Sequence, residues 1–337
     1  MTDPTAAPDT PQPPLSAGEH GLAADAEAAV ETLGQVRAEI GKAIFGQDRV
    51  VELALCAVLA GGHALLIGAP GLAKTRLVEA MSTALGIDGA RIQFTPDLMP
   101  SDILGSEVLE ETAQGERAFR FIKGPIFTQL LMADEINRAS PRTQSALLQA
   151  MQEGHVTVAG ARHDLPRPFH VLATQNPIEQ EGTYPLPEAQ LDRFLLKIDV
   201  GYPDLETERR ILVETTGAAS APVAATLDAH GLMRLQALVR RMPVGEKVLD
   251  AILALVREAR PEQSADERVR RLVDWGPSPR AGQALMLAAR ARALLRGRLA
   301  PSLDDVEALA EPALGHRMAM RYDPTGNAPA LPDLIGE

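Results

Sequence analysis

The sequence predicts an α/β protein in which a parallel β-sheet is sandwiched between helices and followed by an all-helical domain. The first observation is a series of short apolar runs that alternate with helical segments, at residues 64–67, 91–94, 130–133, 169–173 and 195–200. Strands of this length that are apolar on both faces are typical of a parallel sheet with helices on both sides. The second observation is that such runs stop after residue 203, where helical periodicity continues alone.

The N-terminal part begins with a segment rich in proline and alanine. We expect residues 1–25 to be disordered, because this composition buries too little apolar surface to offset the entropy lost on ordering. Apolar side chains at helical spacing then predict helices over residues 27–40 and 50–59. The α/β domain is expected to span residues 26–202.

Two polar hairpins are predicted to interrupt the α/β domain. Each consists of two short strand-like segments around a turn signal, Gln114-Gly115 in the first hairpin and Ala159-Gly160 in the second. The paired segments are residues 107–111 with 119–122, and residues 155–158 with 163–165.

The helical domain is expected over residues 203–337. Glycine- and proline-containing breaks divide it into four or five amphipathic helices up to about residue 321. One of these helical patterns carries four arginines beside leucines that are available for packing. We interpret them as a solvated basic face rather than a nucleic-acid surface; they are Arg290, Arg292, Arg296 and Arg298.

The overall charge argues against two classes of partner. The 337 residues carry 33 Lys and Arg against 45 Asp and Glu, a formal net charge of −12. Tight non-specific binding to DNA or to anionic lipid requires a net basic surface. Aromatic residues make up only 3% of the chain, so base-stacking platforms for single strands are not expected either. We therefore expect neither a nucleic-acid partner nor membrane insertion.

The expected compartment is the cytoplasm. No apolar export signal opens the chain, and the single cysteine, Cys56, has no partner within it for a disulfide, which suits a reducing environment. Residues 53–73 lack charged side chains over a length that can span a bilayer, but glycines and a proline interrupt them. A helix end, a turn, a short strand and a glycine-rich loop explain this stretch better.

The most specific local signal is the run Gly68-Ala-Pro-Gly-Leu-Ala-Lys74-Thr75, which follows an apolar run and opens a helical segment. In this context glycines let backbone N–H groups turn toward a polyphosphate, and the helix N-terminus adds the positive end of its dipole. Lys74 is then expected to reach the β- and γ-phosphates, and Thr75 to place its hydroxyl on Mg²⁺. The alternative is an ordinary tight turn before a helix.

A buried strand that ends in two acids, Asp134 and Glu135, is the second signal. Burial of two carboxylates is unfavourable unless they face a cation or a water-filled site. In a nucleotide site Asp134 would hold the water shell of Mg²⁺, and Glu135 would orient and deprotonate the water that attacks the γ-phosphate. The alternative is a solvated strand end that carries two acids.

Together these runs resemble the AAA+ ATPases, and more narrowly the MoxR family. The resemblance implies a P-loop AAA+ core with a C-terminal helical lid domain. Ala73 stands where the general phosphate-loop pattern has glycine, but the sequence Gly-Leu-Ala-Lys-Thr resembles the loop sequence of this family. Further runs carry the resemblance across residues 44–280: Ile44-Phe-Gly-Gln47, Gln93-Phe-Thr-Pro-Asp-Leu-Met-Pro-Ser-Asp102, Phe121-Ile-Lys-Gly-Pro-Ile-Phe127, Asp134-Glu-Ile-Asn-Arg-Ala-Ser-Pro-Arg142, Ala173-Thr-Gln-Asn-Pro177, Pro187-Glu-Ala-Gln-Leu-Asp-Arg-Phe194 and Ser278-Pro-Arg280.

The resemblance also implies roles for further residues. Asn176 resembles sensor 1, an amide that holds the attacking water, with an Asn-Pro turn as the alternative. Arg193 resembles the arginine finger that acts on the γ-phosphate of the neighbouring subunit; the alternative is a helix-surface arginine paired with Asp192 or Glu188. Arg280 resembles sensor 2, a lid cation that reports the γ-phosphate and couples hydrolysis to lid movement. The implied nucleotide contacts are Phe45, Gly46, Gln47, Gly68, Ala69, Pro70, Gly71, Leu72, Ala73, Lys74, Thr75 and Arg76.

The function that the resemblance implies is Mg²⁺-dependent ATP hydrolysis at the subunit interfaces of a homo-oligomeric ring, expected to be a hexamer. The work would be chaperone-like remodelling or maturation of protein clients, together with partners that carry a von Willebrand factor A domain. The two hairpins would face the pore and grip the client, unless they are solvated surface hairpins. Arg138 and Arg142 are left open as contacts to a neighbouring subunit. Alternative functions are the ATPase subunit of a metal-inserting, magnesium chelatase-like complex, a nucleic-acid motor, and a nucleotide-gated scaffold without useful turnover.

Overall fold

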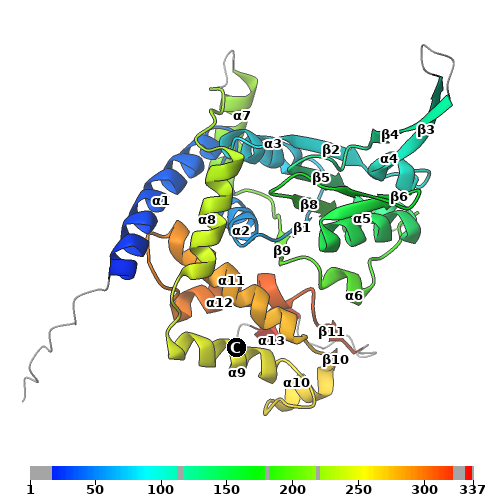
Figure 1. Cartoon of the computed structure of the whole chain (residues 1–337). Helices are drawn as coiled ribbons and strands as arrows, with labels where there is room; N and C mark the ends of the chain where they lie inside the picture. The colour runs from blue at the N-terminus through cyan, green and yellow to red at the C-terminus, as the bar shows by residue number, and fades with distance from the viewer. Residues whose placement is uncertain (1–16, 112–116, 179–181, 218–220, 322–330, 336–337) are drawn as a thin grey trace, which may run out of the picture.

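The centre of the molecule is a sheet of five parallel strands in the order β2-β5-β8-β1-β9. The computed structural model describes residues 17–111, 117–178, 182–217, 221–321 and 331–335. The strands are β1 (Ala64–Ile67), β2 (Gly89–Gln93), β5 (Leu130–Asp134), β8 (His170–Gln175) and β9 (Leu196–Asp199). The predicted parallel sheet is therefore confirmed, and each apolar run overlaps one of these strands (Figure 1).

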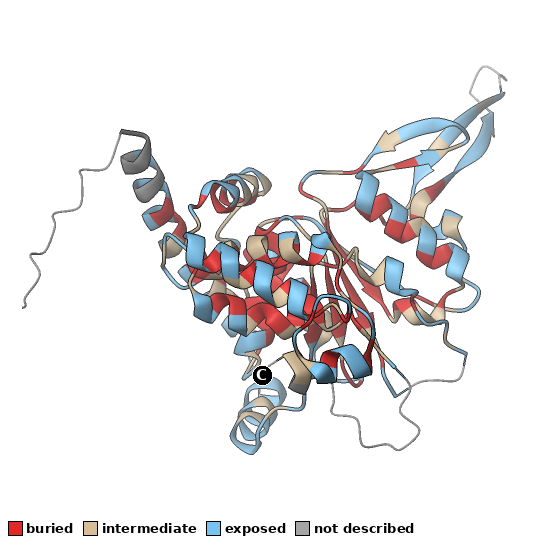
Figure 2. Ribbon diagram, turned by 90° about the horizontal axis from the view of Figure 1, so that it is seen from below, coloured by how far each residue is buried: buried red, intermediate tan, exposed pale blue. Residues whose placement is uncertain are grey.

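Each face of the sheet has its own apolar core, because successive side chains of a strand point to opposite faces. Leu66 and Leu172 belong to one core, and their chain neighbours Leu65 and Val171 belong to the other. The three central strands, β5, β8 and β1, are almost wholly buried (Figure 2). The first core is covered by α1 (Ala17–Gly41), α2 (Asp48–Leu59) and α3 (Lys74–Ala84). The second core is covered by α4 (Pro100–Leu104) and α5 (Pro141–Glu153).

Helix α1 is longer than its apolar pattern predicts. It begins at Ala17, so residues 17–25 of the segment that we expected to be disordered are helical instead, whereas residues 1–16 lie outside the described residues. The first buried residues of the helix are Ala26 and Ala29, which directly follow this part. Alanine is the strongest helix former, but its small side chain contributes little to an apolar pattern, so the sequence analysis placed the start too late.

Both predicted hairpins are confirmed by their strand pairing. β3 (Gly105–Glu111) pairs antiparallel with β4 (Arg117–Lys123), and β6 (His155–Val158) with β7 (Ala161–Asp164). The Gln114-Gly115 turn lies outside the described residues. The rings of Phe121 and His163 stack with centroids 3.9 Å apart, which joins the base of the first hairpin to the second. The β3–β4 hairpin projects from the body of the molecule (Figure 1).

The C-terminal part is mainly helical, as predicted, but differs in detail. Its helices are α7 (Leu205–Thr216), α8 (Ala229–Arg241), α9 (Glu246–Glu258), α10 (Glu267–Leu272), α11 (Pro279–Leu295), α12 (Leu303–Leu314) and α13 (Leu331–Ile335). The prediction that strands stop after residue 203 is wrong, because β10 (Val273–Trp275) and β11 (Ala319–Met320) form a short antiparallel ribbon. Segments of two or three residues are too short to produce a periodic signal. Within the described residues no helix has the length and apolar character needed to cross a bilayer.

Three arginines in and directly after α11 form ion pairs with the α/β part and within the helical part. Arg296 pairs with Glu52 of α2 at 2.6 Å, and Arg292 and Arg298 each pair with Asp305 of α12 at 2.6 Å. Burial opposes ionisation of both carboxyls, but the arginine partners outweigh it and hold the pKa of Glu52 and of Asp305 below the usual range. The prediction of a solvated basic face is therefore wrong for these three arginines.

The ring of His170 is enclosed where β8 begins. It is 1% exposed, its Nδ1 donates to the Gly62 carbonyl at 2.8 Å, and its Nε2 accepts from the Gln236 amide at 2.9 Å. These partners require the neutral ring with the proton on Nδ1, because a carbonyl only accepts and the amide nitrogen only donates. Burial lowers the pKa of His170 to about 4.

We predict that His170 makes the fold sensitive to mild acid. Histidine in an unfolded chain has a pKa of about 6.5. Between that pH and about 4 the unfolded state binds a proton that folded His170 does not, so stability falls as the pH falls through this window. The unfolding free-energy difference between the wild type and His170→Gln should therefore change by about 2 kcal/mol between pH 7 and pH 5, in favour of the variant at low pH. Urea unfolding followed by circular dichroism measures it; parallel pH profiles would contradict the prediction.

Candidate active site

The phosphate-binding candidate is the loop between the end of β1 and the start of α3. Gly71 has φ +82° and Ala73 has φ +55°, so both lie in the left-handed region. A Cβ at Gly71 would meet no atom within 4 Å, which means that glycine is required there for its backbone conformation. A Cβ at Gly68 would lie 2.6 Å from the Val200 carbonyl, so glycine lets the loop leave β1 close to the end of β9. The helix that follows points its N-terminal N–H groups at the loop.

The Lys74 ammonium lies within this loop. Its Nζ donates to the carbonyls of Gly68 at 2.6 Å and Ala69 at 2.9 Å. Burial lowers the pKa of Lys74, and the carboxylates of Asp134 and Glu135 oppose that shift. The ammonium is thus partly desolvated and tied only to neutral carbonyls, an arrangement in which phosphate oxygens would be stronger partners.

Asp134 occupies the carboxyl end of β5 and is only 8% exposed. Its Oδ1 accepts from the Thr174 hydroxyl at 2.6 Å, and its Oδ2 accepts from Arg91 Nη2 of β2 at 2.6 Å. Two neighbouring strands therefore fix the direction of this carboxylate.

Glu135 follows directly and has φ +55°, an uncommon conformation for a residue with a side chain. Its backbone N–H donates to the Thr174 hydroxyl at 2.8 Å. Its Oε2 accepts from Gln93 at 2.7 Å and from Arg138 at 3.0 Å. The turn and the side chain of Glu135 are thus both held by hydrogen bonds. Thr174 thus serves both acids, a role that its run in the sequence does not reveal.

Asn176 follows β8 and is 5% exposed. Its Oδ1 accepts from the Ile178 N–H at 3.1 Å, which leaves the Nδ2 group as its donor end. Because β8 lies between β5 and β1, the parallel sheet brings three chain segments to one edge. They are the loop after Ile67, the acidic pair after Ala133, and Asn176. The structure thus unites most of the sequence-predicted catalytic residues.

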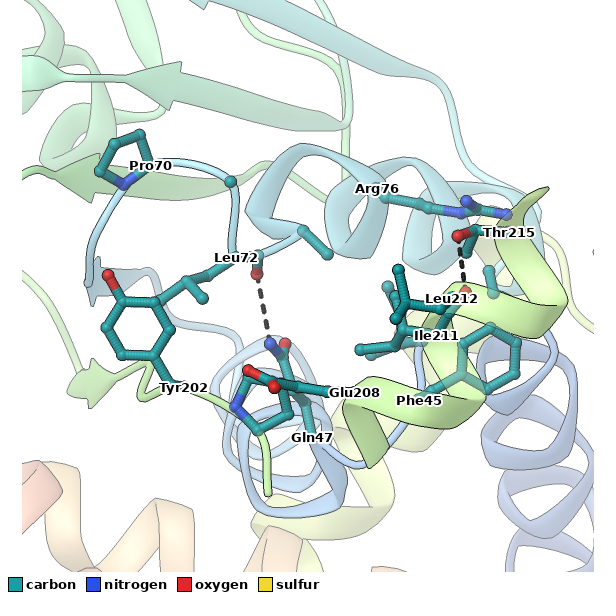
Figure 3. A pocket seen from close by; sticks show the side chains of 15 residues that line it. Phe45, Gln47, Pro70, Leu72, Arg76, Tyr202, Glu208, Ile211, Leu212 and Thr215 are labelled. Atoms are coloured by element: carbon teal, nitrogen blue, oxygen red, sulfur yellow. Dashed lines mark hydrogen bonds between the residues drawn. The ribbon is translucent and has the colours of Figure 1, made fainter. Parts of the chain in front are cut away.

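A cavity of about 390 Å³ adjoins the loop. Phe45 and Gln47 line one part of it, and Pro70, Leu72 and Arg76 line another (Figure 3). Gln47 Nε2 donates to the Leu72 carbonyl at 3.2 Å and so ties the two parts together. The mainly apolar lining suits an adenine ring. Residues that the sequence analysis missed complete the cavity: Tyr202, Pro203, Glu208, Ile211, Leu212 and Thr215.

Not every implied nucleotide contact lines this cavity. Gly46 has φ +65°, and a Cβ there would collide with Thr207 of α7, so its role is to let the backbone pass that helix. Thr75 lies on the first turn of α3 and lines a separate cavity of about 220 Å³ with Arg91. Lys74 is held by the loop itself.

Arg193 and Arg280 lie at the opposite edge of the sheet from the loop. Arg193 lies three residues before the amino end of β9, and the register pairs Ala64 with Leu196 and Ile67 with Asp199. The loop follows the carboxyl end of β1, so about 13 Å of strand separates it from the level of Arg193. The structure therefore brings neither arginine to the loop of its own subunit.

The two arginines instead line one cavity of about 240 Å³, together with Asp192 and Arg317. Arg193 Nη1 donates to the Leu148 carbonyl of α5 at 2.6 Å. Arg280 Nη1 lies 3.9 Å from Asp192 Oδ2. Arg142, which was left open, lies exposed on the first turn of α5.

Comparison with known proteins identifies the family. A family model for the ATPase family associated with various cellular activities (AAA) matches residues 63–196, and an AAA lid domain model matches residues 265–334. Chaperone MoxR1 of Mycobacterium tuberculosis is 44% identical over 91% of this chain and 79% of its own length. Protein MoxR of Methylorubrum extorquens is 32% identical over 88% of this chain and 90% of its own. The chain belongs to the MoxR family of AAA ATPases.

A solved structure supports the same fold for this MoxR-family ATPase. The crystal structure of a candidate ATPase from Cytophaga hutchinsonii matches with a TM-score of 0.87 at 34% identity, covering 95% of this chain and 97% of that one. The resemblance inferred from sequence is thus confirmed for the family, the AAA fold with its helical lid, and ATP hydrolysis. The roles of the individual site residues stay predictions.

We predict that Thr174→Val impairs catalysis in this MoxR-family ATPase more than nucleotide binding. Valine removes the hydroxyl that donates to Asp134 and accepts from the Glu135 N–H, so both groups lose a buried partner. The turnover rate should fall about tenfold or more, and unfolding should become easier by about 1–3 kcal/mol. Thr174→Ser keeps both hydrogen bonds and should retain most activity. Steady-state ATPase assays and nucleotide titration measure this; a valine variant with unchanged turnover would contradict it.

Proposed function

We propose that this protein hydrolyses ATP with Mg²⁺ at the interfaces of a homo-oligomeric ring, where Arg193 and Arg280 of one subunit complete the site of the next. The observation that carries the proposal is the separation of the two arginines from the phosphate loop of their own subunit across the length of β1 and β9. A guanidinium that stabilises the transferred phosphoryl group contributes roughly 10³–10⁵ in rate. In this geometry Arg193 and Arg280 can reach such a phosphoryl group only in a neighbouring copy.

The donor set near the loop fits Mg²⁺. No group of three or more His, Cys, Asp or Glu side chains suited to a metal occurs among the described residues. Mg²⁺ does not require one, because it keeps several waters and binds through one or two carboxylates together with substrate phosphates. Thr75 and Asp134 would hold it. When bound, the ion neutralises negative charge on the phosphate oxygens.

The remaining roles follow from the hydrogen bonds of each side chain. Glu135 would accept the proton of the attacking water, with Gln93 and Arg138 holding its carboxylate in position. Asn176 would orient that water through Nδ2, because its Oδ1 is already bonded. Lys74 would exchange the loop carbonyls for phosphate oxygens.

We propose that the energy of hydrolysis remodels or matures a protein client. Leu109 and Phe119 lie opposite each other in the β3–β4 hairpin and are 50% and 71% exposed. Exposed apolar pairs of this kind mark interaction surfaces, which supports contact between this hairpin and a client. Membership in the MoxR family supports the chaperone role, because one relative in that family is named Chaperone MoxR1. A hexameric ring and a partner with a von Willebrand factor A domain belong to this proposal by family resemblance.

We predict that Glu135→Gln retains ATP binding but loses turnover. Glutamine keeps the size and hydrogen bonding of the side chain but cannot take a proton from water. The turnover rate should fall by about 10²-fold or more, whereas the affinity for ATP should stay close to that of the wild type. Isothermal titration and phosphate release measure the two quantities. Undiminished hydrolysis would remove Glu135 as the base.

A complementation experiment tests catalysis across the interface. Lys74→Ala subunits lack a working loop but keep Arg193, whereas Arg193→Ala subunits keep the loop. Each variant alone should be inactive. An equal mixture should recover about a quarter of the wild-type rate, because that share of interfaces then joins an intact loop to an intact arginine in a cyclic, head-to-tail assembly. A mixture that forms mixed rings but stays inactive would overturn the proposal.

A further inference from the structure

The turn that carries Arg193 is bound by the buried side chain of Arg317, from the segment between α12 and β11. Arg317 is 2% exposed. Its Nε donates to Asp192 Oδ1 at 2.7 Å, and its Nη2 donates to the carbonyls of Asp192 at 3.2 Å and Phe194 at 2.7 Å. Its Nη1 donates to the Leu195 carbonyl at 3.2 Å. One planar guanidinium thus binds the backbone on both sides of Arg193.

His316 reinforces the same contact. It is 6% exposed, and its Nε2 donates to the Phe194 carbonyl at 2.9 Å. Burial lowers the pKa of His316 to about 3, and the charge of Arg317 acts in the same direction. The ring is therefore neutral at physiological pH, and Arg317 supplies the cation of this cluster.

Asp192 connects the turn to the lid. Its Oδ2 accepts from the Ser278 hydroxyl at 3.3 Å and lies 3.9 Å from Arg280 Nη1. Ser278 is the N-cap of α11, and its hydroxyl accepts from the Arg280 N–H at 3.2 Å. The Asp192 carboxylate therefore faces three groups: Arg317, Arg280 and Ser278. Arg193 itself points to α5, where it bonds to Leu148.

The distances indicate which arginine neutralises Asp192. Arg317 contacts it at 2.7 Å with almost no exposure to solvent, whereas Arg280 is 3.9 Å away and its side chain is 56% exposed. The pair with Arg317 is thus the close, desolvated one, and Arg280 remains available for a further anion. Without Arg317, the Asp192 carboxylate would have Arg280 as its neighbouring arginine and would compete with a phosphate of the next subunit for it.

We propose that Arg317 is a positioning residue for catalysis across the interface: it fixes the turn that carries Arg193 and neutralises Asp192, so that Arg193 and Arg280 are both presented to the nucleotide of the next subunit. This inference rests on the proposed function. The inference predicts an effect on only one of the two subunits at an interface. Arg317 serves the site of the neighbour, not the site of its own subunit.

The test uses the mixture of Lys74→Ala and Arg193→Ala subunits described above. Arg317→Lys is introduced into only one of these two subunits at a time. Lysine keeps the charge but lacks the planar set of donors that reaches Asp192 and the carbonyls together. In the Lys74→Ala subunit, which supplies the arginines, it should lower the recovered activity by about tenfold or more. In the Arg193→Ala subunit, which supplies the loop, it should change activity by no more than about twofold. Thermal unfolding of each protein checks that both subunits fold.

Two further variants separate positioning from general stability. Arg296→Met breaks the contact of the residue after α11 with Glu52, and should affect the Lys74→Ala and the Arg193→Ala subunit alike. Ser278→Ala removes one donor to Asp192 without a buried charge, and should show a weaker form of the same directional loss.

Equal losses in both members of the pair would overturn the role of Arg317 and leave the proposed function intact. Failure of the parental Lys74→Ala and Arg193→Ala mixture to recover activity would overturn the proposed function, and this inference with it.

Discussion

The direction of the five parallel strands is the constraint on which the rest of this molecule depends. Parallel strands end at one edge of the sheet, so the loop after β1, the acids after β5 and the amide after β8 meet there without long connections. Because β9 is parallel to the other strands, the segment before it, which contains Arg193, lies at the opposite edge. A chain that must supply both the phosphate loop and the arginines cannot bring them together by itself. The ring proposed above would supply that contact between copies.

Two rigid connections link these edges. Helix α5 starts beside the acidic pair, and its Leu148 carbonyl accepts from Arg193 at the far edge. The lid is joined to the α/β part at the Glu52–Arg296 pair and again at the Asp192–Arg317 pair. Helix α5 thus extends from near Glu135 to the contact with Arg193, and Arg317 connects the lid to the turn that carries Arg193. The Asp192–Arg317 pair is the buried one of the two, and it favours one arrangement because a lone buried charge is strongly unfavourable.

The sequence predicted the sheet and the loop because their signals are local. Runs such as residues 64–67 are apolar on both faces, and the loop residues are contiguous. Thr174 was missed because a buried polar residue in a strand has meaning only beside its neighbour strand, here the one that ends in Asp134. Arg317 was missed because its partner Asp192 lies 125 positions away. The prediction for the arginines in and after α11 was wrong for the same reason. A helical pattern indicates on which face of a helix a residue lies, but not which distant acidic residue it pairs with, here Glu52.

The dependence of ATP hydrolysis on protein concentration tests the central claim most directly. The rate per subunit, the bound nucleotide and the size of the assembly would be measured together over a dilution series, with mass photometry for the last. If the arginines act only between copies, the rate per subunit falls in step with the fraction of subunits in assemblies, while isolated subunits still bind ATP. Isolated subunits that hydrolyse ATP at the rate of the assembly would contradict the claim.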